Sequence, residues 1–341
     1  MKKVILIGLA IIVLCCIAVA ATVYYYLYAP QFHPEKTAYI YVDRDDTADS
    51  VMLKLSLAAA PCELRGFGWM SRYRKYDESI HTGRYAVSPE ENVYTVFSRL
   101  YRGYQSPMNL TVGSTRTVED LARSVARRLM IDSVEIADAL HDSTTLAQLG
   151  YTPTTLPALF VPDTYQVYWD MSAQDFLLRM QREHEAFWND ERRALADSLG
   201  LSPNEVSTLA SIVEEETNRA EEKPIVAGLY LNRLRRGMLL QADPTVKFAV
   251  GDPTLRRILN QHLAVDSPYN TYLYPGLPPG PIRIATPAGI DSVLHYAHHN
   301  YLYMCAAEDF SGTHRFASTL SEHNRNAARY RAALNKRKIY K

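Results

Sequence analysis

The sequence SPNEVSTLASIVEEETNRA, residues 202–220, decides the fold of the C-terminal half. Ser202, Pro203 and Glu205 form a capping box with proline at the first helical position, so this pattern predicts that a helix begins here. The apolar residues that share one face of this helix, at about 100° per residue, are Val206, Leu209, Ala210, Ile212 and Val213. We expect this face to point toward the protein and the helix to run on to residue 220.

Three adjacent glutamates near the end of this stretch are not equivalent. On the same helical wheel Glu216 lies within about 50° of the centre of the apolar face, whereas Glu215 is nearly opposite and Glu214 lies well off it. The spacing therefore predicts that Glu215 is solvated, that Glu214 is intermediate, and that Glu216 points inward.

An inward glutamate has two interpretations. It is either a buried carboxylate in an ion pair, for instance with Arg219, Arg233 or Arg235, or a general acid. Because an apolar pocket disfavours the charged form, it raises the pKa of a carboxyl group, which then carries a proton near neutral pH. Cleavage of a glycosidic bond needs such a proton donor. The wheel alone leaves both interpretations open.

The N-terminus carries a membrane-spanning pattern. Residues 4–23, VILIGLAIIVLCCIAVAATV, contain no charge and are long enough to cross a hydrocarbon core of about 30 Å. Lys2 and Lys3 precede this run, and tyrosines at positions 24, 25, 26 and 28 follow it like an interfacial belt. We predict a cytoplasmic tip at residues 1–3, an anchor at residues 4–26, and the rest of the chain outside the cytoplasm; a cleaved signal peptide is the alternative.

Composition limits the partners that the chain can have. The 341 residues hold 37 basic and 37 acidic side chains, so the formal net charge is zero and the electrostatic footprint of a nucleic-acid-binding protein is missing. Of the four cysteines, Cys62 and Cys305 could pair in an oxidising compartment. The residues predict no cofactor.

The exported part reads as alternating strands and helices, an α+β pattern. After a linker at residues 27–37 we predict a small α/β module at residues 38–113. It has strands at 38–42, 83–87 and 108–112, a helix at 47–57, and a second helix that opens with the capping box SPEE at 88–91. A helical connecting region at 114–200 follows, with helix starts at 117–120 and 172–175. The catalytic domain is expected at 201–341.

The C-terminal half also contains a shaped loop. Residues 267–282, SPYNTYLYPGLPPGPI, hold three tyrosines, five prolines and two glycines, which excludes a regular helix or an interior strand. We expect this loop to present Asn270, Thr271 and Tyr272 to a pocket.

Several blocks occur in a recognisable order: FVPDT (160–164), SIVEEET (211–217), LNRLRRGMLLQADPTV (231–246), SPYNTY (267–272) with GLPPGPI (276–282), HRF (314–316) and EHN (322–324). Together they resemble the YceG-like family of endolytic murein transglycosylases. The resemblance implies an inner-membrane anchor, a LysM-like module at residues 38–113, and a catalytic domain whose lysozyme-like helix bears the essential glutamate, which is Glu216 here. It also implies a set of substrate-binding residues, namely Gln241, Asp243, Thr245, Asn270, Tyr272 and His314.

By the same resemblance, the expected reaction is cleavage between N-acetylmuramic acid and N-acetylglucosamine in nascent peptidoglycan, which leaves 1,6-anhydromuramyl ends and terminates strand elongation. The expected partners are glycan strands, the inner membrane and peptidoglycan synthases. Two alternatives stay open: a hydrolytic muramidase in which Asp243 assists, and a non-catalytic peptidoglycan-binding scaffold. A metal enzyme is disfavoured, since His295 and His299 could share a helix face but there is no HExxH pattern.

Overall fold

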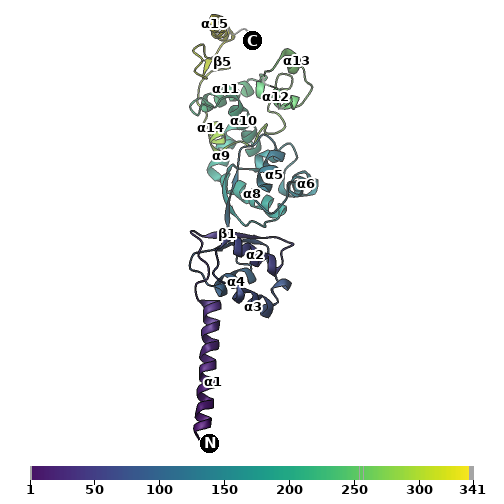
Figure 1. Ribbon diagram of the computed structural model, residues 1–341. Coiled ribbons are helices and arrows are strands. Elements are labelled where there is room, and N and C mark those ends of the chain that lie inside the picture. The colour runs from purple at the N-terminus through teal and green to yellow at the C-terminus, as the bar shows by residue number, and fades with distance from the viewer. Residues whose placement is uncertain (1, 253, 256, 338–341) are drawn as a thin grey trace. The chain divides into compact units, whose positions relative to one another are not determined.

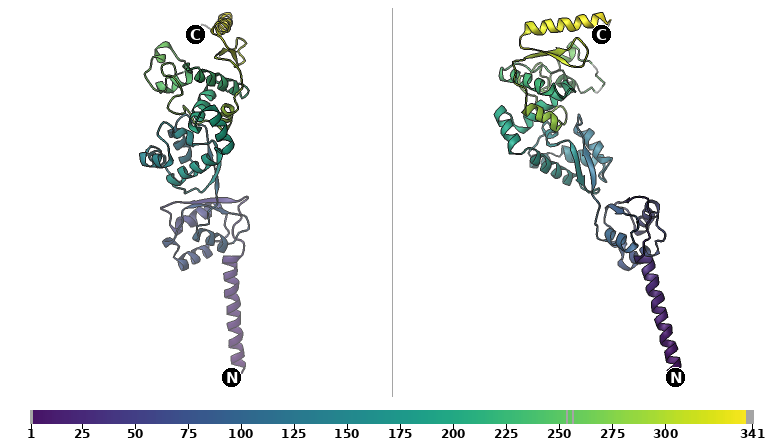
Figure 2. Two further views of the ribbon diagram at one scale, coloured as in Figure 1. Left: turned by 180° about the vertical axis from the view of Figure 1, so that it is seen from behind. Right: turned by 90° about the vertical axis from the view of Figure 1, so that its left-hand side faces the viewer.

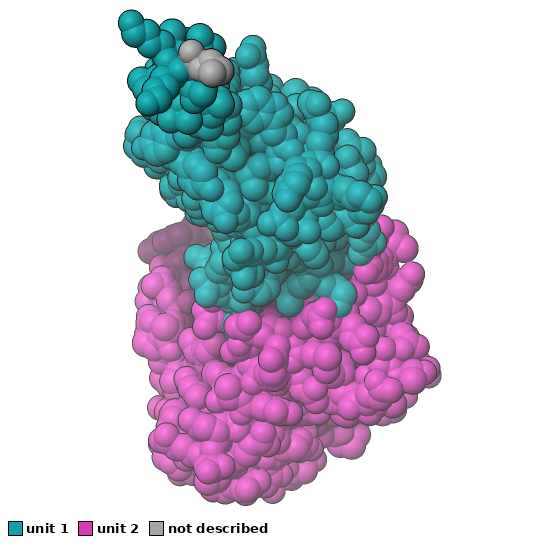
Figure 3. Space-filling view, turned by 90° about the horizontal axis from the view of Figure 1, so that it is seen from below, with its two compact units in different colours: residues 1–110, 128–131, 165–172 teal, residues 111–127, 132–164, 173–341 magenta. Residues whose placement is uncertain are grey.

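The computed structural model describes residues 2–252, 254–255 and 257–337 (Figure 1). The chain is a mixed α+β protein with an apolar N-terminal helix and small two-stranded sheets, as the sequence predicts. It divides into two compact units (Figure 3). Unit 1 comprises residues 1–110, 128–131 and 165–172, and unit 2 comprises residues 111–127, 132–164 and 173–341.

Unit 1 begins with the apolar helix. Helix α1 (Lys2–Val23) continues into a π-helical segment, Tyr24–Tyr28, and extends as a single helix from the body of the unit (Figures 1 and 2). The whole helical stretch is long and apolar enough to cross a membrane. Its side chains are exposed along the whole length of α1, which is the opposite of what a core helix would show.

The body of unit 1 is a strand–helix–helix–strand arrangement. It runs through β1 (Ala38–Val42), α2 (Ala48–Ala58), α3 (Arg65–Arg74) and β2 (Gly83–Val87), and α4 (Val93–Tyr101) follows. Strands β1 and β2 pair antiparallel, with Ala38 opposite Val87 and Val42 opposite Gly83. The helices cover this sheet and bury Val51, Phe67 and Phe97. A LysM-like module would show this order of elements; sugar binding by it stays a prediction.

Two expectations for this region need correction. The strand at residues 108–112, β3 (Met108–Val112), was expected in the same module as the strands at 38–42 and 83–87, but it pairs with β4 (Asp163–Val167) instead. Ser88 does not cap a helix: residues 88–91 form a turn in which Glu90 has φ 63°, and α4 begins later with Asn92 as its cap. The linker at residues 27–37 stays a prediction; within it, Phe32 is fully buried and forms a β-bridge with Pro61.

Unit 2 is mostly helical. Its first helices are α5 (Val118–Ala126), α6 (Ser133–His141), α7 (Ser143–Leu149), α8 (Ala173–Phe187) and α9 (Asp190–Leu199). The second group is α10 (Pro203–Glu216), α11 (Lys223–Arg235), α12 (Asp243–Val250), α13 (Asn260–Leu263) and α14 (Pro287–Leu294). A hairpin of β5 (Tyr303–Ala306) and β6 (His314–Ala317) and the helix α15 (Leu320–Lys336) complete it.

Helix α10 lies at the centre of unit 2. Its capping box is confirmed, because the Ser202 hydroxyl accepts a hydrogen bond from the Glu205 N–H and the Glu205 carboxylate accepts one from the Ser202 N–H. The helix packs against α11 and α14, and every residue from Val206 to Glu214 is buried. The buried hydroxyls bond to backbone carbonyls of the same helix, as Ser207 does to Pro203 at 2.9 Å. Helix α10 is therefore enclosed on all sides rather than on one face.

Candidate active site

The C-terminus of α10 forms the base of the candidate site. The helix ends at Glu216, four residues before the predicted end, because Thr217 takes an extended conformation with φ −144°. The Thr217 hydroxyl then donates to the Glu222 carboxylate at 3.0 Å and so turns the chain away from the helix axis. The three glutamates occupy the last turn.

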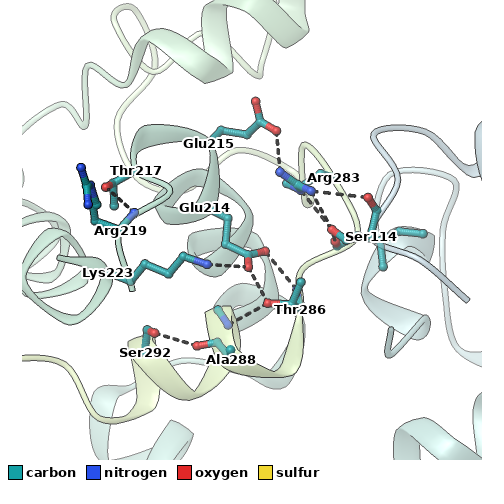
Figure 4. A network of polar contacts seen from close by, with 12 residues as sticks. Ser114, Glu214, Glu215, Thr217, Arg219, Lys223, Arg283, Thr286, Ala288 and Ser292 are labelled. Atoms are coloured by element: carbon teal, nitrogen blue, oxygen red, sulfur yellow. Dashed lines mark hydrogen bonds and ion pairs between the residues drawn. The ribbon is translucent and has the colours of Figure 1, made fainter. Parts of the chain in front are cut away.

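Glu214 is the most buried of the three glutamates, contrary to the wheel prediction. Its carboxylate accepts hydrogen bonds from Lys223 Nζ at 3.1 Å, from the Thr286 N–H at 3.0 Å and from the Thr286 hydroxyl (Figure 4). The side chain is only 4% exposed. Since α10 is surrounded by protein, a side chain off the apolar face still points into the interior.

Glu215 is not solvated either. It forms an ion pair with Arg283 at 2.8 Å and another with Arg116 at 2.7 Å, and its side chain is 15% exposed. The Arg283 guanidinium also donates to the Ser114 hydroxyl (Figure 4). Both cations come from segments that cover the side of α10 which the sequence analysis placed in water.

Glu216 faces a cavity. The Tyr230 hydroxyl, from α11, donates a hydrogen bond of 2.7 Å to Glu216 Oε1. Burial raises the pKa of Glu216 to about 7, and the negative charge of Asp243 adds to the rise. The hydrogen bond from Tyr230 and the positive charge of Arg233 lower the pKa in part. A carboxyl group in this state can both donate and accept a proton near neutral pH.

The cavity has a volume of about 250 Å³. Its walls come from the end of α10, from α11, from the start of α12, from the 267–282 loop and from the β5–β6 hairpin. The lining residues are Glu216, Leu229, Tyr230, Arg233, Leu240, Gln241, Asp243, Tyr272, Met304, Cys305, Ala306 and His314.

Five of the seven predicted site residues meet at this cavity: Glu216, Gln241, Asp243, Tyr272 and His314. The other two, Thr245 and Asn270, are fully buried. Thr245 Oγ1 bonds to Thr271 Oγ1 at 2.8 Å, and the Asn270 amide donates to the carbonyls of residues 263 and 265. These two residues hold the walls in place from behind, and of the three loop residues expected to be presented only Tyr272 lines the cavity.

Asp243 at the start of α12 and Tyr272 in the 267–282 loop join the two segments that form one wall. The Tyr272 hydroxyl donates to Asp243 Oδ1 at 2.7 Å, and the Ala242 N–H donates to Thr271 Oγ1 at 3.0 Å. Gln241 precedes them in the left-handed region, with φ 50°, which non-glycine residues rarely adopt. The surrounding contacts hold Gln241 in this strained conformation beside the cavity.

His314 is oriented by a buried carboxylate. The Glu222 carboxylate accepts the His314 N–H at 2.7 Å and lies 3.0 Å from His314 Nδ1. Burial by itself raises the pKa of Glu222, but the hydrogen bonds from His314 and Thr217 outweigh it and lower that pKa. The imidazole is thereby fixed in the cavity wall.

The sequence analysis missed Tyr230 and named Arg233 only as an ion-pair partner. Arg233 is buried, and its guanidinium donates to the carbonyls of Leu302 at 2.6 Å and Leu240 at 2.7 Å, so it holds β5 and the 239–241 segment against α11. No local pattern singled out Tyr230, because it lies in the apolar run 225–231, IVAGLYL, where a tyrosine is expected to serve as a core residue.

The remaining sequence hypotheses concern metals and disulfides. His295 and His299 do not share a helix, since α14 ends at Leu294 and the His299 ring bonds to the Ile225 carbonyl. Among residues 2–252, 254–255 and 257–337, no group of three or more His, Cys, Asp or Glu residues could hold a metal ion. Cys62 and Cys305 are free thiols.

Comparisons with known proteins identify the family of the chain. The model of the YceG-like family matches residues 40–329, and the chain belongs to this family. An endolytic murein transglycosylase of Bacillus subtilis is 30% identical over 69% of this chain and 68% of its own length. A Streptococcus pneumoniae protein of the same name is 26% identical over 77% of this chain, which spans only 53% of that relative.

A solved structure shows the same fold. The crystal structure of a YceG-like protein from Listeria monocytogenes superposes with a TM-score of 0.57 and covers 86% of this chain and 99% of its own. At 23% sequence identity, this likeness concerns the fold alone.

Proposed function

We propose that this protein is a lytic transglycosylase that cuts peptidoglycan glycan strands internally, with Glu216 as the acid and base. The observation that carries the proposal is a carboxyl group with a pKa of about 7 in a cavity of about 250 Å³. Membership of the YceG-like family and the names of the Bacillus and Streptococcus relatives support the substrate.

In the first step, protonated Glu216 gives its proton to the oxygen between N-acetylmuramic acid and N-acetylglucosamine. The bond from that oxygen to C1 of the muramic acid breaks with an oxocarbenium-like transition state. The C6 hydroxyl then closes on C1, and the Glu216 carboxylate takes its proton. One carboxyl thus acts twice, water is not consumed, and the product is a 1,6-anhydromuramyl end.

A hydrolase is the second candidate, because Asp243 lines the same cavity. A retaining glycosidase needs a second carboxylate at about 5 Å as nucleophile. Asp243 Oδ1 instead accepts a hydrogen bond from the Tyr272 hydroxyl, which holds the carboxylate against the 267–282 loop. We assign Asp243, with Gln241, Tyr272 and His314, to binding the glycan.

The proposal includes the membrane. The length and composition of α1 support an anchor, and Lys2 and Lys3 before it support a cytoplasmic N-terminus with both units outside. An anchored enzyme acts close to the membrane on nascent strands, so we assign it a role in terminating strand elongation together with a peptidoglycan synthase. Proteolysis of right-side-out membrane vesicles tests the orientation. Lys2 and Lys3 should be protected inside, and the rest of the chain should be cleaved from outside.

A single variant pair tests the catalytic assignment. Glu216→Gln keeps the size of the side chain and the Tyr230 contact but cannot give up a proton. It should abolish cleavage of purified glycan strands, whereas the matched variant Glu221→Gln, at an exposed position, should cleave like the wild type. Cleavage by Glu216→Gln at more than a trace of the wild-type rate would remove Glu216 from the mechanism.

A further inference from the structure

We propose that one face of helix α3 rests on the headgroup layer of the membrane, beside the point where α1 leaves it. The surface consists of Arg65, Trp69, Arg72 and Tyr73, which we call the α3 face. Its partner is the phospholipid surface itself. The inference rests on the proposed membrane anchor and adds a second contact between unit 1 and the same bilayer.

The position of α3 follows from its contacts with the end of the anchor. A 22-residue helix rises about 33 Å at 1.5 Å per residue, which matches the hydrocarbon core, so the segment Tyr24–Tyr28 falls at the headgroup level. Helix α3 packs directly on this segment: a Cβ atom on Gly66 would lie 2.1 Å from the Tyr26 carbonyl oxygen. Only glycine permits this approach, so α3 is held at the same level as Tyr26.

A second contact fixes the direction of the α3 face. The Trp69 ring lies edge-on to the Tyr26 ring with centroids 4.9 Å apart, and Arg65 Nη1 lies 3.5 Å from the Tyr26 hydroxyl. The two side chains on α3 that reach toward the anchor therefore belong to the face in question. Helix α4 also contacts the end of the anchor, where the Tyr94 and Tyr28 ring centroids lie 5.3 Å apart.

The chemistry of this face is that of a membrane interface. Arg65, Trp69, Arg72 and Tyr73 are spaced i, i+4, i+7 and i+8, so they share one side of the helix, and all four are exposed. Trp69 is 43% exposed and Tyr73 is 84% exposed. The opposite side holds Phe67 and Ser71, which are buried in unit 1, and Gly66 lies at the edge of the face next to Tyr26.

Exposed tryptophan and tyrosine between guanidinium groups suit the level of lipid headgroups, where rings are half solvated and phosphates attract the cations. Exposed aromatic rings also suit sugars. The contact with Tyr26 decides between these partners, because it places the rings where lipid is present whenever α1 spans the bilayer.

Fluorescence quenching by brominated lipid tests the proposal on the full chain. The protein is reconstituted in vesicles of phosphatidylethanolamine and phosphatidylglycerol, in which part of the lipid is brominated near the top of the acyl chain. We compare the wild type with Trp69→Phe and with the matched variant Trp169→Phe. Trp169 packs on Tyr41 of β1, which lies at the end of unit 1 away from α1 in Figure 1.

The expected result is a quenched component in the wild type that Trp69→Phe loses and Trp169→Phe retains. Equal quenching of the wild type and Trp69→Phe would overturn the proposal. Tyr73→Asp should also reduce the quenching, since it places a negative charge against phosphates, whereas Leu57→Asp on α2, which is 79% exposed, should not.

The failure of this inference and the failure of the anchor give different results. If alkaline carbonate extracts the wild-type protein from the vesicles, the proposed anchor is wrong. If the protein resists extraction but Trp69 is not quenched, the anchor stands and the α3 face does not contact lipid.

Discussion

The Tyr230 hydroxyl lies 2.7 Å from Glu216 Oε1 and donates a hydrogen bond to it. Tyr230 is buried in α11, and its own pKa is raised well above 10 by burial and by the charge of Glu216, so it stays a donor at every working pH. A donor that cannot lose its proton fixes the orientation of the carboxyl group. It also favours the charged form of Glu216 against the burial that favours the neutral one.

Tyr230→Phe should therefore raise the pKa of Glu216 and release its orientation. The alkaline limb of kcat/KM, which reports the acid of the free enzyme, should move to higher pH. The rate at the optimum should fall roughly five- to thirtyfold, as expected for the loss of a hydrogen bond of about 1–2 kcal/mol. A pH–rate profile measures both effects.

The control for this variant is Tyr269→Phe, because Tyr269 is partly buried and packs on Phe248 outside the cavity. It should leave the alkaline limb unchanged. A downward move of the limb in Tyr230→Phe would contradict the role given to the hydroxyl.

Asp243→Asn should move the same limb in the opposite direction. The negative charge of Asp243 contributes to the raised pKa of Glu216, so its removal lowers that pKa and shifts the limb to lower pH. Asparagine can still accept the Tyr272 hydroxyl bond, and cleavage should continue. A loss of activity by a factor of about a thousand or more would instead mark Asp243 as a second catalytic carboxylate.

The raised pKa of Glu216 also has a consequence for stability. The carboxyl group ionises at about pH 4.3 in the unfolded chain but at about 7 in the fold, so ionisation opposes folding as pH rises between these values. The wild type should lose up to about 4 kcal/mol of stability across this window, an upper limit set by one pKa unit being about 1.36 kcal/mol.

Glu216→Gln should escape this loss. Its apparent melting temperature in detergent should exceed that of the wild type at pH 8, and the difference should vanish near pH 4. Equal melting temperatures at pH 8 would show that Glu216 is not desolvated in the fold.

Glu214 and Lys223 form a separate structural pair behind the site, with side chains 4% and 17% exposed. Lys223→Met leaves a buried carboxylate without its cation and should destabilise the protein by about 3 kcal/mol. The double variant Glu214→Gln/Lys223→Met removes both charges, keeps an acceptor for Thr286, and should recover about half of that loss. Chemical denaturation measures the difference; a double variant no better than the single one would contradict the pairing.

Local chemistry made much of the fold predictable. The caps at Thr117 and Ser202 predicted correct helix starts, and the helix expected at 47–57 forms at Ala48–Ala58. The strands predicted at 38–42 and 83–87 are also confirmed. The predicted helix start at Ser88 was wrong because only half of the capping box forms. The Ser88 N–H donates to the Glu91 carboxylate, but Glu90 turns the chain and Asn92 caps α4.

The site was harder to predict because its geometry depends on distant segments. The helical wheel placed Glu216 toward the protein. It assumed that one face of the helix is exposed to solvent, whereas every residue of α10 from Val206 to Glu214 is buried. The cations that bind Glu214 and Glu215 come from residues 116, 223 and 283, which no local pattern connects to α10. For the same reason, nothing in the sequence separated Asn270, which supports a wall, from Tyr272, which lines it.

The central claim is that one carboxyl cuts the glycan without water. The most direct test is to digest purified glycan strands with the full chain in ¹⁸O-labelled water and to analyse the new ends by mass spectrometry. The proposed mechanism predicts anhydromuramyl ends that carry no label and that disappear in Glu216→Gln. Reducing muramic acid ends labelled at C1 would contradict it and identify the protein as a hydrolase.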